Sequence, residues 1–155
     1  MVEVAVIGAG AAGLVASRQL LRCGLRPCVF ESNRLAGGAW NAAGTSNKMW
    51  DNLTPNLSKY TCVFSDSLWP ESSPTFVSRL ELHQYLENYA TTLVDPDCFR
   101  YGCTVTNVKR TSSNQSNNWP LTTNNGGPFQ QRFQVEWADH HGKAQSKEFD
   151  GVIVA

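Results

Sequence analysis

The hydrophobic pattern at the start of the chain predicts a strand, a helix and a second strand. Val2 to Ile7 is a β-branched run followed at once by glycine, which is typical of a strand buried on both faces. From Ala11 to Cys23 the leucines and arginines fall on different sides of a helix, and Gly24 is placed to end it. Arg26 to Glu31 returns to a strand pattern. This order predicts a βαβ unit that begins a parallel sheet.

A second helix and three strand patterns follow. Ser78 and Glu81 form a capping box with apolar residues at helical spacing after it, so we expect a helix over about Arg79 to Thr92. The strand patterns are Cys103 to Val108, Phe133 to Trp137 and Phe149 to Ala155. The first two alternate between apolar and polar residues, whereas the last is typical of a buried strand. The sequence therefore predicts an α/β protein in which a parallel sheet is joined by a small antiparallel β-meander.

Two segments show no sustained period. Ser32 to Leu68 is rich in Gly, Asn and Ser, and loops of this length in a compact domain usually serve a function. Thr111 to Gln131 contains no charged residue and is dominated by polar residues, so we interpret it as a flexible surface insertion. The His140-His141-Gly142 stretch predicts a hairpin turn and no metal site.

Composition and charge narrow the function classes. The chain has 13 Lys+Arg against 13 Asp+Glu among 155 residues, so it lacks the basic surface that nucleic acids require, and we expect no nucleic-acid partner. It contains no apolar run long enough for a membrane segment, and no basic leader precedes the first strand. The five cysteines include no C-x-x-C pair and are interpreted as reduced, mostly buried thiols. These features predict a cytoplasmic protein, with a C-terminal membrane anchor in a longer product left open.

The glycines from Gly8 to Gly13 match G-x-G-x-x-G in an informative context. The motif follows a strand, opens a helix, and is followed 18 residues after Gly13 by Glu31 at the end of the second strand. Gly8 permits the tight turn, Gly10 leaves room for a pyrophosphate, and Gly13 lets helix and strand approach closely. The Glu31 carboxylate would bind ribose hydroxyls and repel a 2′-phosphate, which excludes NADP from this site. The motif thus predicts a dinucleotide site for FAD or NAD.

Five further segments have the residues and spacing of a known family. They are Gly37 to Trp40, Trp50 to Lys59, Phe64 to Pro70, Tyr85 to Ala90 and Phe149 to Ala155. They resemble the GG-x-W, aromatic-Asp-x-Leu-x-Thr-Asn-x-Pro-Lys, F-S-D-x-x-x-P, Y-L-x-x-Y-A and F-D-x-V-I-V-A-T-G segments of the flavin-containing monooxygenases, which are class B flavoprotein monooxygenases. The resemblance implies a Rossmann-like FAD-binding domain over residues 1–155 that is C-terminally truncated and carries the insertion at 111–131.

The resemblance also implies FAD as the cofactor and gives roles to individual residues. The pyrophosphate would lie against Gly8, Ala9, Gly10, Ala11, Ala12 and Gly13, the ribose against Glu31, and the flavin side against Gly38, Ala39 and Trp40. Asn56 matches the family's asparagine beside the flavin ring, which makes it the implied catalytic residue; the alternative is a loop asparagine that satisfies its own backbone. Pro55 replaces a family threonine, which removes a backbone donor and a hydroxyl from the implied NADP contact.

The activity implied by the resemblance is NADPH-dependent oxygenation of an amine nitrogen or a thioether sulfur by O2, through a C4a-hydroperoxyflavin. The short stretch after the GG-x-W segment favours this N- or S-oxygenation over the Baeyer-Villiger type. A second G-x-G-x-x-G for the main NADP(H) site is absent from the chain, so we expect an N-terminal fragment that is inactive alone. Two alternatives remain: another FAD-dependent oxidoreductase of the same fold, such as an amine oxidase, and a non-catalytic flavin-binding remnant.

Overall fold

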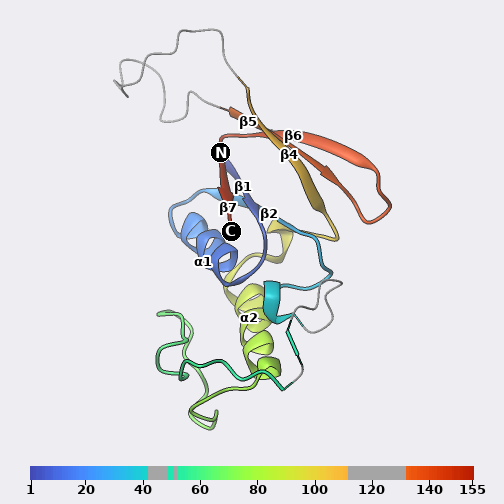
Figure 1. Ribbon diagram of the computed structural model, residues 1–155. Helices are drawn as coiled ribbons and strands as arrows, with labels where there is room; N and C mark the ends of the chain where they lie inside the picture. The colour runs from blue at the N-terminus through green and yellow to red at the C-terminus, as the bar shows by residue number, and fades with distance from the viewer. Residues whose placement is uncertain (42–48, 51, 112–131) are drawn as a thin grey trace.

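The computed structural model describes residues 1–41, 49–50, 52–111 and 132–155. In these ranges the chain forms a four-stranded parallel sheet, a three-stranded antiparallel sheet and two α-helices (Figure 1). The elements in chain order are β1 (Glu3–Ile7), α1 (Ala11–Arg22), β2 (Arg26–Glu31), the 3-10 turn η1 (Gly38–Trp40), α2 (Arg79–Leu93), the 3-10 turn η2 (Pro96–Cys98), β3 (Phe99–Tyr101), β4 (Thr104–Thr111), β5 (Arg132–Ala138), β6 (Ala144–Phe149) and β7 (Gly151–Val154). The predicted α/β class is confirmed.

The parallel sheet has the strand order β3-β2-β1-β7 and contains the predicted βαβ unit. In β1, Val6 lies opposite Val29 of β2 and Ile153 of β7. β1 therefore has a strand on either side, which explains why its residues are almost all apolar. Just beyond β1, the Gly8 N–H donates to the Phe30 carbonyl oxygen at 2.8 Å. The glycine motif thus begins at the carboxyl ends of β1 and β2, the edge where open α/β sheets bind ligands.

Both helices end or begin where their local sequence predicts. After α1, Gly24 takes φ 72° and the Leu25 N–H donates to the Leu20 carbonyl oxygen at 2.9 Å, which closes the helix in a Schellman motif. α2 begins with the predicted capping box, in which Ser78 and Glu81 each accept a backbone hydrogen bond from the other. Its last residue is Leu93, one beyond the expected end.

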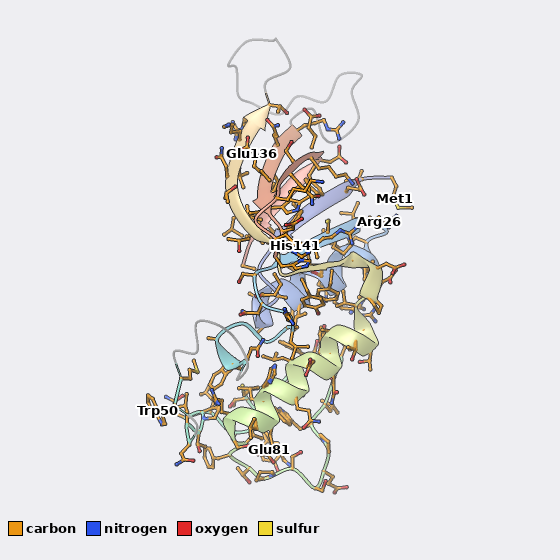
Figure 2. The ribbon with its side chains drawn as sticks, turned by 90° about the vertical axis from the view of Figure 1, so that its right-hand side faces the viewer. Met1, Arg26, Trp50, Glu81, Glu136 and His141 are labelled. Carbon is orange, nitrogen blue, oxygen red and sulfur yellow. The ribbon has the colours of Figure 1, made fainter. Side chains whose placement is uncertain are left out.

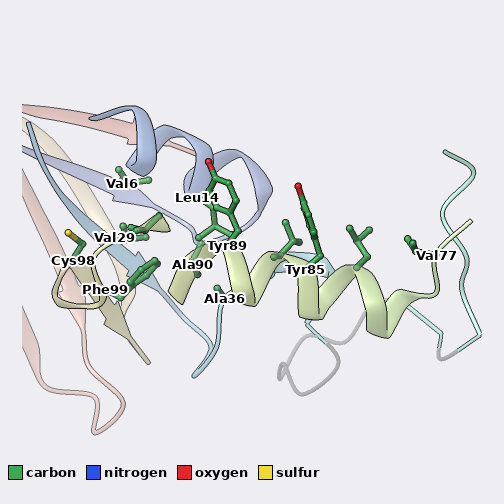
Figure 3. Close-up of a cluster of buried hydrophobic side chains, with 14 residues drawn as sticks. Val6, Leu14, Val29, Ala36, Val77, Tyr85, Tyr89, Ala90, Cys98 and Phe99 are labelled. Atoms are coloured by element: carbon green, nitrogen blue, oxygen red, sulfur yellow. The ribbon is translucent and has the colours of Figure 1, made fainter. Parts of the chain in front are cut away.

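The two faces of the parallel sheet contact different partners. Val6 and Val29 face α1 and α2, where they join a buried cluster with Leu14, Tyr89 and Ala90 (Figure 3). The residues that alternate with them along the strands, Ala5 and Phe30, face the antiparallel sheet and join a second cluster with Val135 and Phe149. Figure 1 shows this arrangement, with the helices on one side of the parallel sheet and β4, β5 and β6 on the other.

The predicted meander is present, but its strands differ from the expected ones in detail. The sheet order is β4-β5-β6, and the β5–β6 hairpin turns at His140-His141-Gly142, as predicted. The expected single strand from Phe149 to Ala155 is wrong, because Phe149 ends β6 and β7 begins at Gly151. Asp150 makes the change of sheet: its N–H donates to the Glu3 carbonyl oxygen and its carboxylate accepts from the Glu3 N–H, both at 2.9 Å.

The start of the expected insertion and the burial of the cysteines also differ from the expectations. Thr111 belongs to β4 and lies opposite Arg132, and the rest of the expected insertion, residues 112–131, lies outside the described residues. All five cysteines are free, but only Cys98 and Cys103 are buried and Cys23 is exposed, so the expectation that most of the thiols are buried is wrong. Among the described helices, none has both the length and the apolar character that crossing a bilayer requires.

Candidate functional site: a glycine-lined edge of the parallel sheet

The glycine loop between β1 and α1 packs as its motif predicts. Gly8 has φ 104°, a conformation that favours glycine. A Cβ on Gly13 would overlap the carbonyl oxygen of Gly8, so the close approach of helix and strand is confirmed. Gly10 differs from both, because a Cβ there would lie 3.7 Å from the Gly38 Cα, an ordinary contact distance. The packing of the residues that the structure describes therefore requires glycine at positions 8 and 13 but not at position 10.

The first turn of α1 is open to an anion. Gly10 is its N-cap residue, and in the described part of the chain this turn has neither a side-chain cap nor an acidic residue. Ala11 and Ala12 are exposed. The first N–H groups of a helix lack carbonyl partners within the helix, and the helix dipole adds a partial positive charge there. Of the predicted pyrophosphate residues, those of the first turn thus present backbone donors at the sheet edge, whereas the N–H groups of Gly8 and Ala9 already donate to Phe30 and Glu31.

Glu31 lies at the end of β2 and is only 4% exposed. Its Oε2 accepts from the Ala9 N–H at 2.8 Å, and its Oε1 accepts from the N–H and Nδ2 of Asn33 at 2.8 and 2.9 Å and from the Ser32 hydroxyl at 3.2 Å. The carboxylate therefore holds the glycine loop against the turn that follows β2. This bracing role was not predicted from the sequence, because the ribose role alone accounted for the acid.

The hydrogen bonds that Glu31 already accepts leave it fewer free lone-pair sites for ribose hydroxyls than the predicted role assumes. A carboxylate has about four lone-pair sites, and Oε1 already accepts three hydrogen bonds. Oε2 accepts one bond, from Ala9, and keeps one site for a ribose hydroxyl. Oε1, with about two lone-pair sites, has none left for a second hydroxyl while Asn33 donates both of its hydrogen bonds. The ribose contact stays a prediction, with one direct bond favoured over two.

The Gly37-Gly38 turn docks directly on the glycine loop. Both residues have positive φ, 115° and 56°, and the Gly37 N–H donates to the Ala9 carbonyl oxygen at 2.9 Å. A Cβ on Gly38 would lie 2.9 Å from the Gly10 Cα, so glycine is needed at position 38 for this contact. The structure therefore brings together two glycine segments that are far apart in the sequence. Their shared surface includes Gly10, a position at which the packing of the described residues does not require glycine.

The residues after the glycine turn are divided between surface and core. Ala39 is exposed and free to contact a ligand. Trp40 is half-buried and packs against the cluster that also holds Leu14 and Tyr89. Its indole therefore supports the turn from inside, and only its exposed part can meet a ligand.

Asn56, the predicted catalytic residue, is exposed in the loop that precedes α2. This loop is held to the first turn of α2, where the Arg79 N–H donates to the Leu53 carbonyl oxygen at 3.1 Å. Figure 2 shows Trp50 and Glu81 at this end of the molecule, opposite Glu136 of the meander. Among the described residues, no hydrogen bond joins Asn56 to the glycine loop. Its contact with a flavin stays a prediction.

The Phe64-Ser65-Asp66 segment ties the loop to both helices. The Tyr85 hydroxyl accepts from the Phe64 N–H at 2.8 Å and donates to the Ser67 carbonyl oxygen at 2.6 Å. The Tyr89 hydroxyl donates to Asp66 at 3.1 Å, and Asp66 also pairs with Arg18 of α1 at 3.4 Å. Burial and the bond to Asp66 raise the pKa of Tyr89 to about 12. These long-range bonds were not predicted from the sequence.

The described residues contain no group of three or more His, Cys, Asp or Glu side chains that could hold a metal ion. The rings of His140 and His141 lie 3.9 Å apart at the hairpin turn. Burial raises the pKa of the Cys28, Cys98 and Cys103 thiols. Thiols of this kind are poor nucleophiles at neutral pH. The chemistry available at the glycine-lined edge is therefore binding by backbone donors, one carboxylate and exposed loop side chains.

Comparison with known proteins matches most of the chain to one family. The family model described as flavin-binding monooxygenase-like matches residues 1–154. The chain is 30% identical over 157 residues to flavin-containing monooxygenase 5 of Rattus norvegicus, and the match covers 98% of this chain and 27% of the relative. The chain thus spans just over a quarter of the length of that relative.

Solved structures match the same fold. The S-allyl-L-cysteine S-oxygenase from Allium sativum has a TM-score of 0.74 at 24% identity, covering 98% of this chain and 35% of that one. The structure of OTEMO in complex with FAD and NADP has a TM-score of 0.73 at 17% identity, covering 99% of this chain and 25% of that one. These likenesses confirm the predicted Rossmann-like fold class.

Proposed function

Because the chain belongs to the flavin-binding monooxygenase-like family, we propose that residues 1–155 form the FAD-binding domain of a flavin-dependent monooxygenase. The chain spans 27% of the rat relative, so the activity proposed is that of the whole protein. The chain has one G-x-G-x-x-G motif, which we assign to FAD. The main NADP(H) site is therefore assigned to sequence outside these residues.

The observation that carries this proposal is the glycine at position 10. Among the described residues, a Cβ there would meet only the Gly38 Cα at 3.7 Å, so neither their packing nor the backbone conformation requires glycine. Gly10 is also the N-cap of an α1 whose first turn has exposed alanines and, among the described residues, no side-chain cap. A phosphate approaching those N–H groups does require the absence of a side chain. The edge therefore fits the pyrophosphate of a dinucleotide.

The proposed FAD contacts follow from this placement. The residues assigned to them are Gly8, Ala9, Gly10, Ala11, Ala12, Gly13, Glu31, Gly38, Ala39, Trp40 and Asn56. The first turn of α1 binds the pyrophosphate, and Glu31, fixed by Ala9 and Asn33, orients the ribose. The Gly37-Gly38 turn lets the backbone approach the ligand closely. When bound, FAD supplies the redox chemistry with NADPH and O2, which no side chain of this chain can supply.

We assign the substrates to soft nucleophiles, amines or thioethers, and Asn56 to a hydrogen bond at the flavin. The family assignment supports the monooxygenase class, and the plant S-oxygenase of the same fold acts on a sulfur, as its name says. Asn56 is exposed, so its amide is available to a ligand rather than buried in the core. The chain's own part in the reaction is to bind and orient the cofactor. A site that excludes water also protects reactive species.

The cofactor proposal is tested by flavin content in the full-length protein. Gly10→Val places a branched side chain where the pyrophosphate would lie, and we expect it to abolish FAD retention with unchanged far-UV circular dichroism. Gln19→Val adds the same side chain at an exposed position of the same helix and should retain FAD. One FAD per Gly10→Val chain would overturn the assigned site.

The activity proposal is tested with NADPH, O2 and two probe substrates, N,N-dimethylaniline and a methyl aryl sulfide. We expect NADPH to reduce the bound flavin and at least one probe to yield its N-oxide or sulfoxide. Flavin reduced by an amine and not by NADPH would instead indicate an amine oxidase. Absence of flavin from the purified full-length protein would indicate a remnant without the cofactor.

A further inference from the structure

His83 lies in the second turn of α2, is 9% exposed, and points at the glycine turn of the proposed FAD site. Its Nε2 lies 3.1 Å from the Ala36 carbonyl oxygen. A carbonyl oxygen can only accept, so Nε2 is the donor and carries the proton. Figure 3 shows Ala36 beside α2. The bond therefore links α2 to the residue immediately before the two glycines.

The His83 ring also shapes the turn by contact. A Cβ on Gly37 would lie 2.6 Å from Cδ2 of His83, so the ring occupies the space that a side chain at position 37 would need. Gly37 has φ 115°, a conformation that other residues rarely adopt. The imidazole therefore packs against Gly37 through Cδ2 and is hydrogen-bonded to the Ala36 carbonyl oxygen through Nε2.

The bond from His83 and a bond from the glycine loop hold the same peptide unit. The Ala36 carbonyl and the Gly37 N–H belong to one trans peptide, whose two polar groups point in opposite directions. His83 donates to the carbonyl, and the N–H donates to the Ala9 carbonyl oxygen at 2.9 Å. Rotation of this peptide would break both bonds at once. Its orientation is therefore fixed between α2 and the glycine loop.

This peptide is continuous with the rest of the site. Ala9, which accepts from Gly37, donates its own N–H to Glu31 at 2.8 Å. A series of hydrogen bonds thus runs from His83 through the 36–37 peptide and Ala9 to the carboxylate at the end of β2. We propose that His83 is a positioning residue of the flavin site, which acts by locking the Ala36–Gly37 peptide against the glycine loop. The proposal rests on the FAD site assigned above.

The test compares three variants of the full-length protein. His83→Leu removes the donor at similar volume, and we expect FAD affinity to fall about tenfold, the order expected for one lost hydrogen bond. We also expect the visible circular dichroism of the remaining bound flavin to change, because the backbone beside it is no longer fixed. His83→Gln keeps an amide donor at the same reach and should recover most of the affinity and the spectrum. Gln84→Leu, at the exposed neighbour, should behave as wild type.

The outcomes separate the two proposals. Wild-type protein that binds no FAD would overturn the proposed function. Wild type that binds FAD together with a folded His83→Leu variant of unchanged affinity and spectrum would overturn the role of His83 alone. Should His83→Leu fail to fold, 15N NMR of wild-type His83 decides: a proton on Nε2 is expected, and the Nδ1–H tautomer overturns the proposal.

Discussion

Gly10 and Gly13 stand three residues apart in one motif, yet physically different constraints act on them. A Cβ at position 13 would overlap the Gly8 carbonyl oxygen, which belongs to the backbone and cannot move aside as a flexible side chain could. A Cβ at position 10 would lie at an ordinary contact distance, 3.7 Å, from the Gly38 Cα. The motif therefore combines a folding requirement at Gly13 with the binding requirement that we propose for Gly10. The two are separable by experiment.

We expect Gly13→Ala to lower the free energy of unfolding by about 1–3 kcal/mol or more, because the added methyl group overpacks a backbone contact. Gly10→Ala should leave the unfolding free energy of the FAD-free protein within about 0.5 kcal/mol and weaken FAD binding. Urea titration followed by circular dichroism measures the first quantity, and flavin fluorescence titration measures the second. Equal loss of stability in both variants would contradict the separation.

Glu31 has a similar double role, since it braces the loop and is assigned to the ribose. Glu31→Ala leaves the Ala9 and Asn33 N–H groups without their buried acceptor, so we expect losses of about 1–3 kcal/mol in stability and in FAD binding. Glu31→Gln keeps one acceptor oxygen and should recover part of the stability. Calorimetric FAD titration and urea titration measure the two effects. An unchanged FAD affinity in folded Glu31→Ala would remove the ribose role and leave only the brace.

At the scale of elements, the phenol groups of α2 make stability depend on pH. The pKa of Tyr89 is raised to about 12 by burial and by its bond to Asp66. An unfolded chain releases this proton near pH 10, so the stabilisation is fully present below about pH 10 and is lost as the pH rises towards 12. We expect the wild-type unfolding free energy to fall across this window.

Tyr89→Phe isolates this contribution, because Phe cannot titrate. The variant should show a fall smaller than that of wild type by up to about 2 kcal/mol between pH 10 and pH 12. Tyr85 has a raised pKa for the same main cause, burial, and remains in both proteins, so it cancels in the comparison. Unfolding free energies at several pH values give the two slopes. Parallel slopes would show that Tyr89 does not titrate differently in the folded and unfolded states.

The elements that could be predicted from sequence are those whose signals are local. The capping box at Ser78 and the stop at Gly24 involve residues only a few positions apart, so α1 and α2 were predicted almost to the residue. β6 was missed because its residues before Phe149 are all exposed and show no alternation. β3 has only three residues and exists by pairing with β2. Strands of this kind are defined by their neighbours in space, which a single sequence does not reveal.

The same distinction holds for the site. The glycine motif and Glu31 were predicted, because a short fixed spacing in a βαβ unit carries the signal. His83 was not predicted, since its partner Ala36 lies 47 residues away in sequence. One indication was available: a histidine on the apolar side of a helix, next to Leu82, needs a buried polar partner.

At the scale of the whole molecule, binding at one edge should leave a pattern across the fold. The glycine loop and the Gly37-Gly38 turn are joined by hydrogen bonds to each other and to β2 and α2. The β5–β6 hairpin packs, through Phe149 and Val135, on the face of the parallel sheet that is turned away from α1 and α2. Ligand contacts made only at the glycine-lined edge therefore act locally, apart from the general gain in stability that any ligand of the folded state confers.

Hydrogen exchange in the full-length protein, with and without FAD, checks this pattern. We expect FAD to slow exchange of the amides at residues 9–14 and 36–41, because both segments are assigned to the ligand and a bound ligand suppresses local opening. Amides at the far end of the meander, around Lys109 of β4 and Gln134 of β5, should exchange equally with and without FAD, since local opening there does not involve the site. In Gly10→Val the protection at 9–14 should disappear at the same FAD concentration. Protection confined to the far end of the meander would place the ligand away from the glycine loop and contradict the assigned edge.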